Sequence, residues 1–140
     1  MEPVMTVDAL NDFVAAEFPQ ATGLYEVVSV APMAARVRMR VGDEHLRPGG
    51  TVSGPSIFGL MDCAVYYAIL AMIGPEALTV TTNASVDFMR KPAPATDLIA
   101  DVELLKVGRT LCVGDVRVRS DGQDAVVARA TMTYSRPPKR

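Results

Sequence analysis

The first forty residues change from a helical to a strand-like spacing of apolar positions. Residues 7–18 carry apolar side chains every three or four positions, which predicts an amphipathic helix that ends before Pro19. In residues 35–41 arginines alternate strictly with apolar residues, which is typical of a half-buried strand, and residues 24–31 are suited to be its hairpin partner. The chain is therefore predicted to begin with a helix and a hairpin.

A long apolar segment follows a polar stretch that is rich in glycine and proline. Residues 56–73 contain a single charged residue, Asp62, and Gly74-Pro75 ends the segment. Ser53 and Gly54 are residue types suited to the N-cap of a helix that begins here. A membrane span would have a similar length, but the charge inside the segment and its polar flanks favour a helix in the core of a globular domain.

The second half of the chain consists of strand-like segments separated by loops. They predict four strands, at residues 78–90, 97–108, 109–120 and 124–135. An apolar helix needs a sheet to cover it, so the pattern predicts an α+β fold in which one curved antiparallel sheet wraps around the long helix. We expect a single domain over residues 1–140, with the first helix in residues 1–20 and a flexible tail at residues 136–140. The edges of such a sheet invite pairing with a second subunit.

Composition and charge exclude several classes of protein. The 140 residues carry 14 basic and 16 acidic side chains, a net charge of −2, whereas nucleic-acid-binding proteins usually show a basic excess. Neither Cys63 nor Cys112 has a partner at metal-ligand spacing, and no nucleotide-binding motif occurs, so we expect no metal and no cofactor. Both cysteines lie in apolar runs and no signal-peptide pattern is present, which predicts a cytoplasmic protein.

Asp62 is the residue that most strongly suggests chemistry. A carboxylate in the second turn of an apolar helix costs free energy unless it is paired, solvated or used. Its position leaves two interpretations open: a general base or nucleophile, and a polar contact near the start of the helix. The glycine-rich residues 49–55 before the helix let a ligand approach backbone N–H groups, with Gly54 or Ser56 as donor, although such a loop is often only a turn.

Four stretches of the chain resemble one family of enzymes. Residues 50–62, GTVSGPSIFGLMD, resemble the motif at the start of the central helix in hotdog-fold acyl-CoA thioesterases of the phenylacetate-pathway (PaaI-like) type. Residues 85–97, SVDFMRKPAPATD, are similar to the strand and loop that follow in that family, and VGRT and RATMTY are similar to its final strands. The resemblance covers about residues 20–135 and implies the hotdog fold, which has the order of elements predicted above.

The resemblance also implies roles for individual residues. Asp62 matches the catalytic carboxylate, which acts as general base for water or as nucleophile on the thioester carbonyl. Gly54 matches the glycine whose backbone N–H polarises that carbonyl. Thr81 falls near a position that holds a water-orienting hydroxyl from the partner subunit, and Asn83 is an alternative for the same role.

The chain departs from the family pattern beside the helix, which leaves three functions open. Ser53-Gly54-Pro55 stands where the family has histidine-glycine-glycine, and Arg47 stands where it often has an amide. The first function is thioester hydrolysis, with Ser53 retained in the candidate site. The second is an acyl-CoA or acyl-ligand binding protein without hydrolysis. The third is a dehydratase or hydratase, which would need His45, the only histidine, although we expect its side chain to be solvated.

The resemblance implies a substrate and an assembly as well. Coenzyme A would enter as part of the substrate, with Arg90, Lys91 and Arg109 as candidates to bind its phosphates. The acyl group would lie against the long helix, where Phe58, Met61 and Tyr66 are candidates. We expect a homodimer or homotetramer with the site at the subunit interface, and neither a nucleic acid nor a membrane as partner.

Overall fold

The structure, a computed structural model, consists of two helices and a six-stranded sheet. It describes residues 1–21, 23–47 and 50–138. The helices are α1 (Val7–Glu17) and α2 (Gly54–Ile73), with short 3₁₀ turns at Pro19–Ala21 and Asp43–His45. The strands are β1 (Tyr25–Ala31), β2 (Ala34–Met39), β3 (Val80–Phe88), β4 (Leu98–Val107), β5 (Leu111–Ser120) and β6 (Val126–Ser135). Each predicted element is present, so the predicted α+β order is confirmed.

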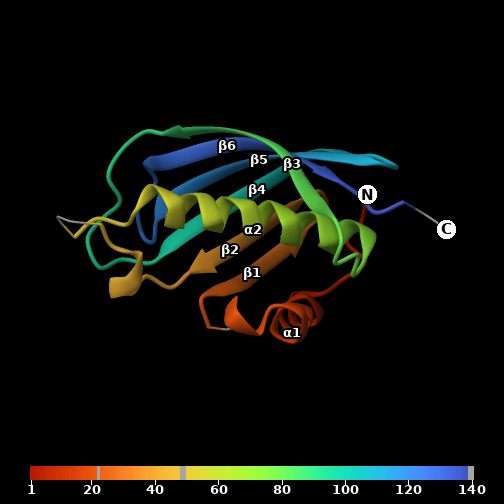
Figure 1. Cartoon of the computed structure of the whole chain (residues 1–140), viewed down its shortest axis with the longest axis horizontal. Helices are drawn as coiled ribbons and strands as arrows, with labels where there is room; N and C mark the ends of the chain where they lie inside the picture. Colours follow the sequence, from red (N-terminus) through yellow and green to blue (C-terminus); the bar gives the residue numbers. More distant parts are fainter. Residues whose placement is uncertain (22, 48–49, 139–140) are drawn as a thin grey trace.

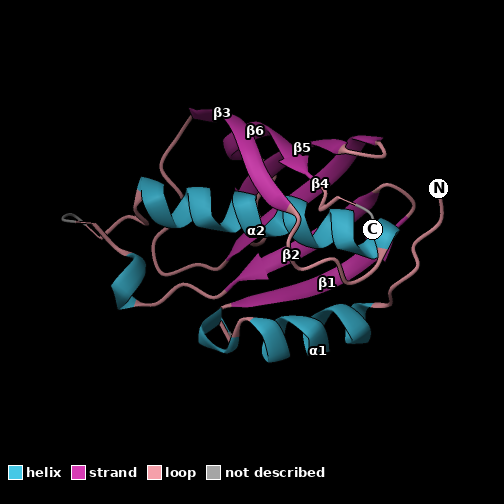
Figure 2. Ribbon diagram, turned by 45° about the vertical axis from the view of Figure 1, so that its right-hand side comes forward, coloured by secondary structure: helices cyan, strands magenta, loops and turns pink. Residues whose placement is uncertain are grey.

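The sheet is antiparallel throughout and curves around α2. Its strand order is β1-β2-β4-β5-β6-β3, so β1 and β3 form the two edges. Figure 1 shows α2 lying along one face of the sheet, and Figure 2 shows α1 beside β1, at the edge opposite to β3. This is the predicted arrangement of a curved sheet wrapped around one long central helix.

The long helix owes its position to its apolar surface and to its caps. Ser53 is the N-cap, with its hydroxyl oxygen accepting a hydrogen bond from the Ser56 N–H at 3.3 Å, and Gly74 ends the helix with a φ of 97°. Twelve of the 20 residues of α2 are buried. By length and composition α2 could cross a membrane, but its burial under the sheet makes it the core helix of this domain.

Strand β3 is an edge strand with an irregular start. Along one side it pairs with β6, and eight of its nine residues are exposed. The register shifts between Thr81, which lies opposite Tyr134, and Asn83, which lies opposite Thr133. The extra residue of this bulge, Thr82, changes which side chains face α2, since side chains alternate along a strand.

The carboxyl-terminal residues differ from the expectation at one point. Arg136, predicted to lie in a flexible tail, donates hydrogen bonds from its guanidinium group to the Glu76 carboxylate at 3.1 Å and to the Gly108 carbonyl at 3.0 Å. Its side chain is 14% exposed, so the chain is held in place as far as this residue. The tail prediction is therefore wrong for Arg136, and residues 139–140 lie outside the described residues.

Candidate active site

The carboxylate of Asp62 is held by two hydroxyl groups of the same chain. The Thr81 hydroxyl and the Tyr134 hydroxyl each donate a hydrogen bond to Asp62 Oδ1, both at 2.6 Å. The Tyr134 hydroxyl also contacts the backbone carbonyl oxygen of Asp62. Among the described residues, Asp62 Oδ2 has no hydrogen-bond partner. The side chain is thus fixed through one oxygen while the other is free to accept a proton.

The bulge in β3 decides which side chain reaches Asp62. Thr81 lies opposite Tyr134, whose side chain is buried under α2, and residues directly opposite share a face of the sheet. Asn83 follows the extra residue and lies opposite Thr133, on the other face. Within one chain, the structure therefore places Thr81 beside Asp62, and Asn83 faces away from it. The contact forms within one chain, which corrects the expectation that Thr81 comes from the partner subunit.

Tyr134 is a site residue that the sequence reasoning missed. Its side chain is 1% exposed, and its pKa is raised by burial and by the negative charge of Asp62. The hydroxyl therefore stays neutral and acts as a hydrogen-bond donor. A signal was present in the sequence: the alternation in residues 129–134 puts this tyrosine on the buried face, where its hydroxyl needs a partner.

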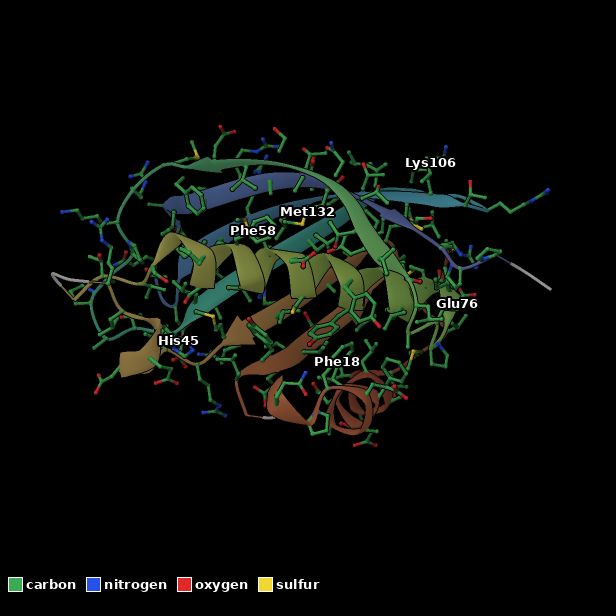
Figure 3. The ribbon with its side chains drawn as sticks, viewed as in Figure 1. Phe18, His45, Phe58, Glu76, Lys106 and Met132 are labelled. Atoms are coloured by element: carbon green, nitrogen blue, oxygen red, sulfur yellow. The ribbon has the colours of Figure 1, made fainter. Side chains whose placement is uncertain are left out.

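A hollow of about 350 Å³ lies beside Asp62 and is mostly apolar. We call it the carboxylate pocket; its lining residues are Phe18, Asp62, Cys63, Tyr66, Ala77, Thr79, Val80, Thr81 and Tyr134. The rings of Phe18 and Tyr66 meet edge to face, with centroids 6.0 Å apart. Figure 3 shows Phe18 at the end of α1, on the side of α2 away from β6.

The residues predicted to contact an acyl group are only partly in this pocket. Tyr66 lines it, whereas Phe58 and Met61 do not. Met61 is fully buried in the core, and Phe58 packs against the core as a half-buried side chain. Met61 therefore packs in the core, which corrects the expectation that it contacts the acyl group.

The Cys63 thiol also lines the carboxylate pocket, but it is poorly suited to act as a nucleophile. Burial and the negative charge of Asp62 raise the pKa of this thiol to about 11. Because the thiolate is the reactive form, little of it exists near neutral pH. Cys112 is fully buried, and burial raises the pKa of its thiol too.

Both cysteines should therefore resist modification in the folded protein. At pH 8 we expect a disulfide reagent such as Ellman's reagent to react with Cys63 at least about a hundredfold more slowly than with free cysteine. The measurement is absorbance over time for the native protein, and for the same protein in guanidinium chloride, where both thiols should react quickly. If Cys63 of the native protein reacted about as fast as free cysteine, the raised pKa of its thiol would be contradicted.

A second hollow, of about 330 Å³, lies at the amino-terminal end of α2, and we call it the helix-start pocket. Its lining residues are Arg47, Thr51, Val52, Gly54, Ile57, Phe88, Met89, Arg90, Lys91 and Pro92. Arg90 and Lys91, which were predicted to bind the phosphates of coenzyme A, both line this pocket together with Arg47. Arg109 lines neither pocket, because it belongs to the turn between β4 and β5.

The first turn of α2 offers one backbone donor to the helix-start pocket. The Ser56 N–H is taken by the Ser53 hydroxyl, and Pro55 has no N–H. The Gly54 N–H has no partner among the described residues and remains available. Ser53 acts as the cap of the helix, which is a structural role.

Gly54 and Asp62 cannot meet within one chain. They lie eight residues apart on α2, which corresponds to about 12 Å along the helix axis. The two groups also line different pockets. A single carbonyl group could therefore contact both only if a second copy of the chain supplied one of them.

His45 has a different environment from the one expected. It is 8% exposed rather than solvated, and its Nδ1 accepts a hydrogen bond from the Gly42 N–H at 2.8 Å. The imidazole thus holds its own loop together, and it does not line the carboxylate pocket. A dehydratase in which His45 works beside Asp62 is not supported by this placement.

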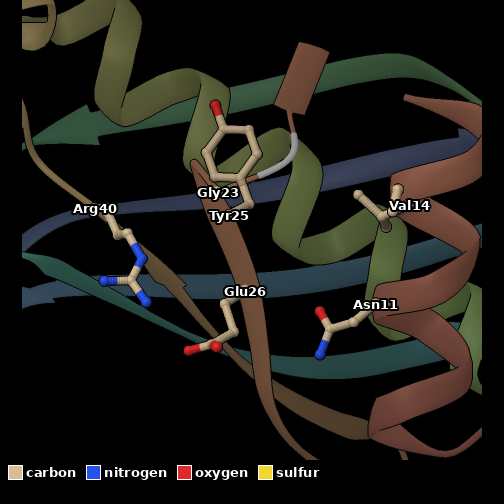
Figure 4. A pocket seen from close by; sticks show the side chains of 7 residues that line it. Asn11, Val14, Gly23, Tyr25, Glu26 and Arg40 are labelled. Carbon is tan, nitrogen blue, oxygen red and sulfur yellow. The ribbon is translucent and has the colours of Figure 1, made fainter. Parts of the chain in front are cut away.

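Another hollow in the described chain lies where α1 is attached to the sheet. Figure 4 shows this hollow between α1 and β1, where Asn11 reaches from α1 towards β1. Its amide donates to the Val27 carbonyl at 3.2 Å and accepts from the Val27 N–H at 3.0 Å, which attaches the helix to the sheet. No group of three histidine, cysteine or acidic side chains suited to a metal ion occurs among the described residues.

Comparisons with known proteins agree with the observed fold. The chain is similar to a "putative thioesterase" from a Silicibacter species, with 52% identity, 99% of this chain and 96% of that one covered, and a TM-score of 0.92. It is similar to a mutant of the phenylacetic acid degradation protein PaaI from Thermus thermophilus, at 28% identity, 85% and 99% coverage and a TM-score of 0.72. It is also similar to a Streptococcus mutans protein solved with acetyl-CoA bound, at 28% identity, 83% and 90% coverage and a TM-score of 0.70.

These similarities bear out the hotdog fold and the PaaI-like type that the sequence predicts. The family model described as "Thioesterase superfamily" matches residues 49–127, which is more than half of the chain. Those residues include all of α2 and β3 and therefore Asp62, Gly54 and Thr81. The chain belongs to the thioesterase superfamily.

Proposed function

We propose that this protein hydrolyses acyl-CoA thioesters, with Asp62 as the catalytic carboxylate. The observation that carries the proposal is the environment of that side chain: one oxygen accepts hydrogen bonds from Thr81 and Tyr134, and the other is free beside an apolar pocket. A carboxylate held in this way is pre-oriented for one task. The Streptococcus mutans relative with bound acetyl-CoA supports an acyl-CoA as the ligand class.

The chemistry can be written with Asp62 as general base. Oδ2 accepts a proton from a water molecule while the water oxygen attacks the thioester carbonyl carbon. The negative charge that develops on the carbonyl oxygen is stabilised by the Gly54 N–H at the start of α2. The C–S bond then breaks, and the thiolate of coenzyme A receives the proton from Asp62. Direct attack by Oδ2 on the carbonyl needs the same carboxylate and remains the alternative route.

Two copies of the chain are needed to assemble this site, and the edge strand β3 supplies the geometry. Gly54 lies beside the carboxyl-terminal end of β3, because a Cβ atom added to Gly54 would stand 3.7 Å from the Phe88 ring. Asp62 lies beside the amino-terminal end of β3, where it accepts a hydrogen bond from Thr81. If two β3 edges pair antiparallel about a two-fold axis that passes between Ala84 and Ser85, Thr81 of one copy comes opposite Phe88 of the other. Gly54 of the second copy then approaches Asp62 of the first.

The helix-start pocket suits the coenzyme A part of the substrate. Arg47, Arg90 and Lys91 bring three cationic side chains to the pocket that contains Gly54. Phosphate groups pair well with arginine and lysine, and a helix amino terminus favours negative charge. In the two-copy arrangement, coenzyme A would lie against one chain while the acyl group reaches the carboxylate pocket of the other.

The proposal is tested by hydrolysis of a panel of acyl-CoA thioesters, from short aliphatic through aromatic to long-chain acyl groups. The readout is loss of thioester absorbance, which is independent of the protein's own thiols. Turnover of at least one class of substrate is the expected result. No turnover across the panel by a correctly folded oligomer would contradict the proposal.

A second candidate function is supported by one feature of the site. Pro55 removes a backbone N–H from the first turn of α2, and the Ser56 N–H is used by the cap, which leaves Gly54 as the one donor we identify there. A site with fewer donors stabilises an oxyanion less well. The alternative is a protein that binds acyl-CoA or another acyl ligand without hydrolysing it. Tight binding of a panel member without turnover would favour this alternative.

Replacing Tyr134 with phenylalanine should lower kcat by about tenfold, because it removes one of two hydrogen bonds that orient the carboxylate. KM should change little, since the ring stays in place. The steady-state rates should be measured in the wild type and in an Asp62→Asn background. The substitution should have no further effect on the residual rate of the Asp62→Asn variant. Equal losses in both backgrounds would show that Tyr134 acts only through the stability of the fold.

A further inference from the structure

The carboxylate pocket receives one side chain from the end of α1. Phe18, the C-cap residue of this helix, lines the pocket together with Asp62 and Tyr66 of α2. The other lining residues belong to α2, to residues 77–81 and to β6. The Phe18 ring meets the Tyr66 ring edge to face, with ring centroids 6.0 Å apart. An aromatic ring from α1 is therefore one wall of the pocket that contains the proposed catalytic carboxylate.

Along α2 the pocket extends for about one helical turn. Its lining residues on this helix are Asp62, Cys63 and Tyr66, and none of the α2 residues after Tyr66, all of which the structure describes, lines it. Tyr66 follows Asp62 by four residues, which corresponds to about 6 Å along the helix axis. Because the Phe18 ring packs against Tyr66, it bounds the pocket about one turn beyond the carboxylate.

Contacts on both sides hold this wall in place. Tyr66, against which the ring packs, donates a hydrogen bond from its hydroxyl to the Ala77 carbonyl at 3.1 Å. The Phe18 N–H donates to the Val14 carbonyl at 2.8 Å, and Val14 is itself buried in the core. The Asn11 amide attaches the same helix to β1. The ring is therefore a fixed boundary of the pocket.

The extent of the pocket corresponds to a short acyl chain. An extended polypeptide advances about 3.5 Å for every three backbone bonds, so a carbon chain of similar geometry advances about 1.2 Å per bond. A pocket about 6 Å long then accommodates about five bonds, which is a chain of about six carbons counted from the thioester carbonyl. The mostly apolar lining suits an alkyl chain. The next carbons of a longer chain would meet the Phe18 ring.

We propose that the carboxylate pocket holds an acyl chain of about four to six carbons and that Phe18 sets this length by blocking longer chains. This inference rests on the proposed thioesterase function and specifies its substrate class as short-chain acyl-CoA. Each methylene that fits an apolar pocket adds to the stabilisation of the transition state, until the chain reaches the ring. Phe18 is thus a specificity-determining residue that lies outside the catalytic groups.

A series of straight-chain acyl-CoA substrates tests the assignment. For the wild type, kcat/KM should rise from acetyl-CoA to hexanoyl-CoA and should be at least about tenfold lower for decanoyl-CoA than for hexanoyl-CoA. Phe18→Ala removes the blocking ring and should raise the ratio of kcat/KM for decanoyl-CoA to that for hexanoyl-CoA at least about tenfold. Phe18→Trp introduces a larger ring and should make butanoyl-CoA a better substrate than hexanoyl-CoA.

A second phenylalanine of α1 provides the matched control. Phe13 is half-buried against the core, as Phe18 is, but it does not line the carboxylate pocket. Phe13→Ala should leave the dependence of kcat/KM on chain length unchanged. The melting temperature of each variant is recorded, because a loss of stability lowers the rate with every substrate alike and leaves the ratio between substrates unchanged. If Phe18→Ala failed to fold, Phe18→Trp would still test the role of the ring in the opposite direction.

The outcomes separate this inference from the proposed function. An unchanged ratio in Phe18→Ala, or a wild type that hydrolyses decanoyl-CoA as well as hexanoyl-CoA, would overturn the role of Phe18 and leave the thioesterase function standing. Absence of turnover with every acyl-CoA would contradict the thioesterase function alone. The affinities for hexanoyl-CoA and decanoyl-CoA are then compared by calorimetry. A gain of at least about tenfold in the relative affinity for decanoyl-CoA in Phe18→Ala supports the role of Phe18, and an unchanged relative affinity or an absence of binding overturns it.

Discussion

Replacing Asp62 with asparagine should lower the rate of thioester hydrolysis by about a thousandfold, within the range expected for loss of a general base. The amide cannot accept the proton of the attacking water, and it is a poor nucleophile. Its oxygen can still accept hydrogen bonds from Thr81 and Tyr134, so the side chain should keep its orientation. The affinity for acyl-CoA, the melting temperature and the oligomeric state should stay close to those of the wild type.

A second carboxylate provides the control for this experiment. Asp124 is exposed in the turn before β6 and makes no ion pair or side-chain hydrogen bond among the described residues. Asp124→Asn makes the same change of charge and should leave kcat and KM unchanged. If Asp62→Asn retained more than about a tenth of the wild-type rate, Asp62 would not be the catalytic group.

The sequence was sufficient to predict the order of the elements because the apolar spacing indicates whether each segment is a helix or a strand. The run of apolar residues in α2 could only be a core helix or a membrane span, and the single carboxylate inside it favoured the core. Ser53 and Gly74 marked its ends because capping depends on residues next to one another in the chain. The strict alternation in β2 likewise depends on neighbouring residues only, and it predicted which side chains of this strand face the core.

The site was less predictable because it depends on register between distant strands. Whether Thr81 or Asn83 faces Asp62 is decided by one extra residue in β3, and no local pattern identifies that bulge. The contact of Tyr134 with Asp62 joins residues 72 positions apart. The separation of Gly54 from Asp62, in contrast, follows from helix geometry alone and could have been derived from their spacing.

Mixing two inactive variants should restore activity if each site combines Gly54 of one chain with Asp62 of another. Gly54→Pro removes the backbone donor at the first position of α2, where proline is well tolerated, and Ser53 before it is already extended. Loss of an oxyanion donor should reduce kcat by about 10²–10³. Asp62→Asn is inactive because it removes the catalytic carboxylate, which belongs to the other half of the site.

In a mixed dimer, one of the two sites pairs the intact Gly54 of the Asp62→Asn chain with the intact Asp62 of the Gly54→Pro chain. The second site carries both defects. Random pairing of equal amounts makes half of the dimers mixed, so the mixture should recover about a quarter of wild-type activity under the two-fold symmetry proposed here. Co-expression of differently tagged chains, followed by tandem purification, isolates the mixed dimers for measurement.

The control mixture combines Asp62→Asn with Asp62→Ala, which damage the same half of each site and should show no recovery. Mixed Asp62→Asn and Gly54→Pro dimers that stay inactive would contradict a site shared between chains. Within one chain the Gly54 N–H and the Asp62 carboxylate are about 12 Å apart along α2, too far to act on one carbonyl group. Thioester hydrolysis by this protein is therefore expected to require two chains, with the exposed edge of β3 bringing the two halves of each site together.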